Sequence, residues 1–135
     1  MIEQLELLYT RVWREHDLEG ALADLPQDFE WLVPGFPGNQ AARGPEGTID
    51  FFRDWIDQWE DLRVDWELEQ GSPDAVLAIV DMRGRGRASG VPVELHFAQV
   101  WSFREGVPVR MVFYNDAEDA RRAAGISSSP AAPEP

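Results

Sequence analysis

Apolar and polar residues alternate along three segments in the second half of the chain, which is the pattern of β-strands that bury one face. Turn-forming residues at 88–90 and 104–106 separate these segments, so the pattern predicts two consecutive hairpins. Because side chains on a strand alternate between faces, a tight turn at 89–90 fixes the register and pairs Val80 with Gln99. In that register one face is apolar except for Gln99. A single amide in an aromatic wall is typical of a pocket with one hydrogen-bonding group.

The opposite face of these strands carries Asp81 and Arg83 beside Glu94 and His96. We interpret these side chains as a salt-bridge network on the outside of the sheet. A shift of the register by one residue would turn the arginine row inward and leave the apolar residues outside, which argues against such a shift.

The first half of the chain reads as helices with one short strand. Apolar residues at helical spacing predict an amphipathic helix over 2–16, and Asp17 can cap a short second helix over 18–25. A strand over 28–33 ends in a segment rich in Pro and Gly, and a third helix begins at about Pro45. We place four large rings on one side of this third helix: Phe51, Phe52, Trp55 and Trp59.

A clean alternation of apolar and acidic residues predicts another strand over 62–70. After the hairpins, Asp116 can cap a final short helix that ends near Gly125. We expect one domain over residues 1–125 and a disordered tail, rich in Ser, Pro and Ala, over 126–135.

This order of elements favours an α+β fold. A curved antiparallel sheet wraps around the N-terminal helices and forms a cone-shaped cavity. Six tryptophans among 135 residues support this arrangement, because large rings fill or line such a space. Core packing is the simpler interpretation for any single tryptophan, but a cluster predicts that some rings face the cavity: Trp31, Trp55, Trp59 and Trp101.

Composition removes several classes of function. The net charge is −13, with 12 basic residues against 25 acidic ones, so a nucleic-acid partner is not expected. The absence of cysteine excludes thiolate chemistry, and the absence of lysine excludes a Schiff base. Two distant histidines give no metal-site pattern, and we expect neither a metal nor a cofactor. With no apolar run near the ~20 residues of a membrane span and no signal-peptide pattern, we expect a cytoplasmic protein without a membrane partner.

Three segments, taken in order, resemble the NTF2-like superfamily and in particular its SnoaL-like members. They are HDLEGALADL after the first helix, FEWLVPG followed by GPEGTIDFFRDW, and RGRGRASGVPVELHFAQVWSFREGVPVRMVFYND. The resemblance covers residues 2–125 and implies the cone-shaped fold that ketosteroid isomerase also has. It does not specify a function, because this fold hosts isomerases, cyclases, hydrolases, carriers and binding modules.

The resemblance to ketosteroid isomerase implies a tyrosine on the first helix, a carboxylate base at the end of the first strand and a protonated acid on a later strand. Tyr9 matches the tyrosine, but Val33 stands in place of the base and Gln99 in place of the acid. Without a base, isomerase chemistry of that type is excluded. The cyclase and epoxide hydrolase members also use buried carboxylates, and the concave face expected here has none.

Three residues are candidates for chemistry. Tyr9 is either a donor to a ligand oxygen or a core ring, and the sequence leaves both open. Gln99 is the stronger candidate, because a buried amide needs hydrogen-bond partners that an aromatic wall does not supply. His16 lies two helical turns after Tyr9 on the same face, where it is either a general acid/base or a residue that suits a helix C-terminus. Asn115 either lines the mouth of the cavity or shapes the chain before Asp116.

We expect the ligand to contact a mainly aromatic lining: Tyr9, Trp13, Trp31, Val33, Phe52, Trp55, Trp59, Trp66, Phe97, Gln99, Trp101, Met111, Phe113 and Asn115. The preferred hypothesis is a domain that binds a small, mostly apolar molecule bearing an oxygen. One alternative is an enzyme of the isomerase, cyclase or hydrolase type, in which Tyr9 and Gln99 polarise a carbonyl. Another is a protein-interaction module that uses the outer face of the sheet.

Relatives of this fold commonly dimerise through that outer face, so the resemblance implies a homodimer. Apolar residues among the charges suit such a symmetric interface: Leu77, Ile79, Val100 and Val112.

Overall fold

The chain forms helices in its first half and long strands in its second half in the computed structural model, which describes residues 1–34 and 41–126. In order, these residues form α1 (Ile2–Trp13), α2 (Leu18–Leu22), β1 (Glu30–Leu32), β2 (Ala41–Arg43), α3 (Gly44–Ile56), β3 (Trp59–Gln70), β4 (Ala75–Gly86), β5 (Pro92–Arg104), β6 (Val107–Tyr114) and α4 (Ala117–Ala123). The expected α+β class is therefore confirmed. Apart from residue 126, the expected disordered tail lies outside the described residues.

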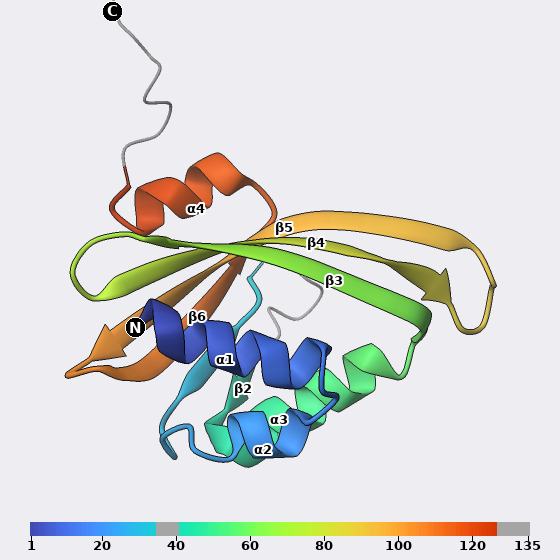
Figure 1. Cartoon of the computed structure of the whole chain (residues 1–135), viewed down its shortest axis with the longest axis horizontal. Helices are drawn as coiled ribbons and strands as arrows, with labels where there is room; N and C mark the ends of the chain where they lie inside the picture. Colours follow the sequence, from blue (N-terminus) through green and yellow to red (C-terminus); the bar gives the residue numbers. More distant parts are fainter. Residues whose placement is uncertain (35–40, 127–135) are drawn as a thin grey trace, which may run out of the picture.

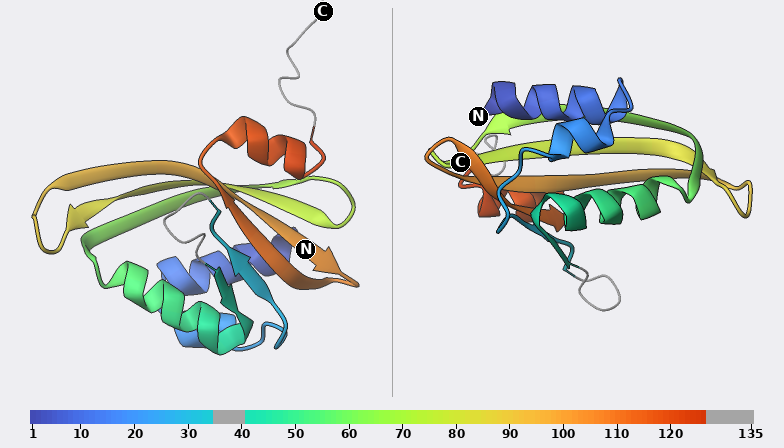
Figure 2. Two further views of the ribbon diagram at one scale, coloured as in Figure 1. Left: turned by 180° about the vertical axis from the view of Figure 1, so that it is seen from behind. Right: turned by 90° about the horizontal axis from the view of Figure 1, so that it is seen from below.

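The strands form one curved sheet in the order β2-β1-β6-β5-β4-β3. The long strands pair antiparallel as expected, but β1 runs parallel to β6, so the sheet is mixed at that point. Figures 1 and 2 show α1, α2 and α3 on the concave side of the sheet and α4 on the opposite side. None of the described helices is long and apolar enough to cross a membrane.

The hairpin of β4 and β5 has the predicted faces but a different register. Gly86 N donates to Val91 O at 3.1 Å, so four residues rather than two form the loop. The predicted pairing of Val80 with Gln99 is therefore wrong, and Val80 lies opposite Phe97. Because the error is two residues, every side chain keeps its predicted face. On the outer face, Asp81 pairs with His96 and Arg83 with Glu94.

The hairpin of β5 and β6 turns where the sequence predicts, and its loop has two residues. Glu105 and Gly106 both have positive φ, 53° and 78°, as the central residues of a two-residue hairpin turn require. The predicted caps are also confirmed, since Asp17 accepts from Gly20 N at 3.0 Å and Asp116 accepts from Glu118 N at 2.7 Å. A hydrogen bond from Arg11 and the one from Gly20 hold the pKa of Asp17 below its usual range.

Other boundaries differ from the prediction. Helix α1 ends at Trp13 rather than at residue 16, because the chain turns at His16, whose φ is 57°. Strand β2 is not predicted, since its three small or exposed residues carry no alternation. Trp59 begins β3 instead of lying on α3, because α3 ends at Ile56.

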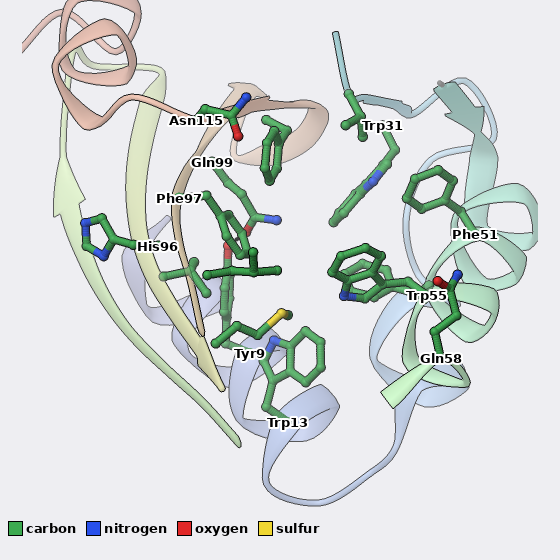
Figure 3. Close-up of a pocket in the computed structure, with 16 residues that line it drawn as sticks. Tyr9, Trp13, Trp31, Phe51, Trp55, Gln58, His96, Phe97, Gln99 and Asn115 are labelled. Carbon is green, nitrogen blue, oxygen red and sulfur yellow. Dashed lines mark hydrogen bonds between the residues drawn. The ribbon is translucent and has the colours of Figure 1, made fainter. Parts of the chain in front are cut away.

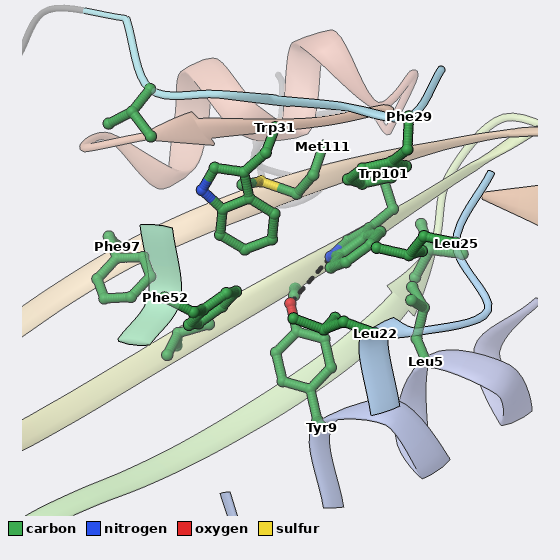
Figure 4. Packing of buried hydrophobic residues seen from close by; sticks show 14 of the residues in the cluster. Leu5, Tyr9, Leu22, Leu25, Phe29, Trp31, Phe52, Phe97, Trp101 and Met111 are labelled. Carbon is green, nitrogen blue, oxygen red and sulfur yellow. Dashed lines mark hydrogen bonds between the residues drawn. The ribbon is translucent and has the colours of Figure 1, made fainter. Parts of the chain in front are cut away.

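Apolar side chains pack on both faces of the sheet. The larger cluster fills the concave side, where Leu5 and Tyr9 of α1 meet Phe29 and Trp101 (Figure 4). A second cluster lies under α4, where Ala120 and Ala124 cover the opposite face. Its sheet residues include Leu77 and Val100, 0% and 5% exposed, so the expectation that both lie on an open outer face is wrong.

Candidate functional site

A cavity of about 360 Å³ lies between the concave face of the sheet and helices α1 and α3 (Figure 3). Its size is that of a small-molecule site. Most of the expected ligand-contact residues line it: Tyr9, Trp13, Trp31, Val33, Phe52, Trp55, Phe97, Gln99, Phe113 and Asn115. The structure adds lining residues that the sequence analysis did not select: Phe51, Gln58, Val80, Met82, Leu95 and His96. Of these, Val80 and Met82 share the predicted face of β4, and their alternation could have identified them.

Aromatic rings pack against one another within each wall of the cavity. Phe97 and Phe113 lie side by side on the sheet, with ring centroids 4.9 Å apart. Across the cavity, Trp31 packs on Phe52 at 4.5 Å in an edge-to-face geometry, and Trp13 packs on Phe52 at 5.7 Å. Figure 3 shows Phe97 and Gln99 facing Trp31 and the rings of α3. Such contacts hold the two walls in defined positions.

One hydrogen-bonded series of buried side chains connects the core to the cavity. Trp101 Nε1 donates to the Tyr9 hydroxyl oxygen at 2.9 Å (Figure 4), and the Tyr9 hydroxyl donates to Gln99 Oε1. The three residues are 1%, 3% and 6% exposed, respectively. Burial raises the pKa of Tyr9 well above its usual value, and the bond from Trp101 opposes that effect only in part. Tyr9 is therefore a neutral phenol whose proton is engaged inside the protein.

The amide nitrogen of Gln99 is the polar atom that this series leaves for the cavity. Figure 3 shows Gln99 Nε2 directed into the cavity, and it has no hydrogen-bond acceptor among the described residues. The opposite orientation of the amide would leave the Tyr9 hydroxyl proton without an acceptor, because Trp101 Nε1 can only donate. The cavity thus receives an N–H₂ group.

Several expected site residues lie behind the lining. Trp101 and Met111 are fully buried in the core under the cavity. Trp66 lies further along the sheet, where its indole nitrogen donates to Glu6 at 3.0 Å. Trp59 packs against Trp55 with ring centroids 5.4 Å apart. Trp55 lines the cavity, whereas Trp59 does not.

The structure does not bring His16 to the cavity. It lies exposed at the junction of α1 and α2, on a separate shallow groove that includes Arg53 and Ile56. His96 is one of the lining residues, but Figure 3 shows its ring turned away from the cavity. The ring bonds to Asp81. Arg83 pairs with Asp65 at 3.7 Å on the same outer face. These exposed pairs form the charge network that the alternation predicts.

The described lining contains no carboxylate and no arginine. Among the described residues, no three His, Cys, Asp or Glu side chains are grouped so that they could hold a metal ion. The chemistry available at the cavity is therefore hydrogen bonding by neutral side chains, among them the fixed amide of Gln99, within an aromatic enclosure.

Comparisons with known proteins give the family. The model of the SnoaL-like domain matches residues 6–111, and the chain belongs to this SnoaL-like family of the NTF2-like superfamily. A search of curated proteins finds no match.

Solved structures of similar fold include an NTF2-like protein of unknown function from Burkholderia pseudomallei, 22% identical, with a TM-score of 0.72 over 91% of this chain and 95% of that one. TerC co-crystallised with polyporic acid is 23% identical, with a TM-score of 0.71 over 91% and 95% of the two chains. A protein of ketosteroid isomerase-like fold from Catenulispora acidiphila, in complex with trimethylamine, is 11% identical, with a TM-score of 0.68 over 90% and 92%. At these identities the likeness establishes the fold alone.

Proposed function

We propose that this protein binds a small, mostly apolar molecule through an oxygen that accepts a hydrogen bond from Gln99. The observation that carries the proposal is the amide of Gln99, a residue only 6% exposed, whose N–H₂ group is directed into an aromatic cavity and has no acceptor among the described residues. A buried donor of this kind is costly unless a ligand or water satisfies it.

Two solved relatives in fold were crystallised with small organic molecules, polyporic acid in one and trimethylamine in the other. These complexes support the use of such a cavity for a small ligand. The volume of about 360 Å³ and the aromatic walls of this chain support an apolar ligand body.

Binding is favoured over proton-transfer catalysis by the groups around the cavity. The described lining holds no carboxylate, and the hydroxyl proton of Tyr9 is committed to Gln99. A general base needs hydrogen-bond reach to the proton it removes, and His16 lies on a different surface. Both carbonyl polarisers considered from the sequence line the cavity, but the Tyr9 proton is bonded to Gln99, so Gln99 is the donor we propose for a ligand.

The experiment is a binding titration followed by tryptophan fluorescence, with 2-acetonaphthone as the probe. Native mass spectrometry of the freshly purified protein accompanies it and reports any co-purified molecule and the expected dimer mass. We expect saturable quenching, because Trp13, Trp31 and Trp55 line the cavity.

The variant Gln99→Met keeps the side-chain length but removes the donor. We expect it to bind 2-acetonaphthone about three- to tenfold more weakly, the usual contribution of one neutral hydrogen bond. Gln4→Met makes the same change on the exposed face of α1 and should bind as the natural protein does. Equal binding by all three proteins would contradict the role of Gln99, and no binding by the natural protein would contradict the proposed function.

A further inference from the structure

A glutamine amide can offer a cavity either its N–H₂ group or its carbonyl, and the two ends select opposite ligands. In this protein, Trp101 and Tyr9 determine which end of the Gln99 amide faces the cavity. Trp101 can only donate, so the Tyr9 oxygen accepts at 2.9 Å and the Tyr9 proton must go to a further acceptor. Gln99 Oε1 is that acceptor. The amide is thereby held with its donor end towards the cavity.

We propose that Tyr9 and Trp101 are positioning residues that determine specificity, and that they make the cavity select neutral ligands with a carbonyl-type oxygen. This inference rests on the proposed function, since it concerns which ligand the same cavity takes. Trp101 is enclosed in the core, and the Tyr9 hydroxyl acts through Gln99. A ligand that presents a hydroxyl or amine donor at this point would meet another donor.

The surroundings also disfavour a charged ligand. Aromatic walls attract cations, and the chain has a net charge of −13. The carboxylates of Asp81 and Asp65, however, lie on the outer face of the sheet, where Asp81 bonds to His96 and Asp65 pairs with Arg83. A cation inside would lose its hydration and face the positive end of the Gln99 amide, with no carboxylate in the described lining. An anion would find neutral amides and no arginine in the described lining.

The two walls specify the shape of the apolar part. Figure 3 shows Gln99 beside Phe97 on the sheet, with Trp31, Phe51 and Trp55 across the cavity. A flat ring system between these walls would place a carbonyl substituent against Gln99 Nε2. The ligand class is therefore a flat, neutral, carbonyl-bearing molecule.

The test uses three probes that share one ring system. 2-Acetonaphthone carries the carbonyl, 2-isopropenylnaphthalene replaces its oxygen with a CH₂ group of similar shape, and 2-naphthyltrimethylammonium carries a cation. We expect the natural protein to bind the ketone about tenfold more tightly than the alkene, because the alkene leaves a buried donor unpaired. The cation should bind about tenfold more weakly than the ketone.

The variant Tyr9→Phe removes the hydroxyl proton that bonds to Gln99 Oε1, so the Gln99 amide is free to rotate. Its preference for the ketone over the alkene should fall to about threefold or less. Tyr114→Phe is the matched control, because Tyr114 is the other tyrosine and packs in the cluster under α4. It should keep the tenfold preference.

An infrared difference spectrum of bound 2-acetonaphthone gives a readout that does not depend on a variant. In the natural protein the carbonyl band should move to lower frequency than in an apolar solvent, as a hydrogen-bonded carbonyl does. An unshifted band, equal binding of ketone and alkene, or a tenfold preference that survives in folded Tyr9→Phe would each overturn the inference. A tenfold preference that survives in Tyr9→Phe would leave the proposed function standing, whereas failure of every probe to bind would remove both.

Discussion

The hydroxyl of Tyr9 makes its contribution to stability through two buried partners, and Tyr9→Phe tests this directly. The substitution keeps the ring, which packs against Trp66 at 5.6 Å and Trp101 at 6.1 Å between centroids. It leaves Trp101 Nε1 and Gln99 Oε1 without their partner, and both residues are at least 94% buried. Each unsatisfied buried group costs about 1–3 kcal/mol. We expect a loss of about 2–6 kcal/mol in the free energy of unfolding.

Urea denaturation followed by tryptophan fluorescence measures this loss as a lower midpoint at unchanged m-value. A double-mutant cycle with Gln99→Leu then isolates the interaction. Because Tyr9 and Gln99 share one hydrogen bond, the double variant should lose less stability than the sum of the single variants, by about 1 kcal/mol or more. Additive losses would refute the series of hydrogen bonds, as would a loss no greater than that of Tyr114→Phe.

Other consequences can be measured in the same way. Burial raises the pKa of Tyr9, so the folded protein retains a proton that an unfolded tyrosine releases above pH ~10. The stabilising contribution of neutral Tyr9 is therefore complete below pH 10 and is lost at higher pH, by up to about 1.4 kcal/mol per pH unit. Urea titrations at pH 9–11 should show this fall in the free energy of unfolding of the natural protein and a shallower fall in Tyr9→Phe. Gly71→Ala should destabilise strongly and release α4, since a Cβ there would lie 2.2 Å from Ala124 O. Gly47→Ala, inside α3 with its closest neighbour 3.8 Å away, should stabilise by about 0.5–1 kcal/mol in thermal unfolding. A stabilising Gly71→Ala would contradict the packing of α4 described here.

The alternation of residues predicts which face of the sheet Gln99 lies on, whereas the length of the loop between β4 and β5 decides which residue lies opposite it. The faces of β4 and β5 follow from alternation, and an error of two residues in register leaves them unchanged. Nothing in the letters between Gly86 and Val91 distinguishes a two-residue turn from a four-residue loop, because Arg87 and Ala88 suit either. The inward position of Gln99 was therefore predictable, and its neighbour across the strand was not.

The bond between Tyr9 and Gln99 joins residues 90 positions apart, and only the docking of α1 on the sheet creates it. The sequence left two roles open for Tyr9, a ligand donor and a core ring with an internal partner, and the structure shows the second. Trp101 was placed on the correct face of β5, but its ring lies beneath Tyr9 and does not reach the lining. Depth below a surface depends on which helix covers it, and alternation carries no such information.

The same alternation predicts apolar residues on the outer face of the sheet, and the sequence analysis expects a second protomer to cover them. Helix α4 supplies that covering for Leu77 and Val100 within one chain. Ile79 and Val112 are only half-buried, so the predicted homodimer would use this remaining part of the face. Short helices at the end of a chain give weak signals, because their partner surface lies far away in sequence.

The packing of α4 also has a mechanical consequence for the cavity. Ala98 and Val100, which flank Gln99 on β5, point to the other side of the sheet and pack in the cluster with Ala120 and Ala124. The strand that carries the ligand-facing amide is thus clamped from behind by a helix that never reaches the cavity. The opposite wall, formed by the rings of α3, also has a neighbour outside the sheet, because α2 contacts α3. The hydrogen-bonding amide is therefore held in place from the side of the sheet that faces away from the ligand.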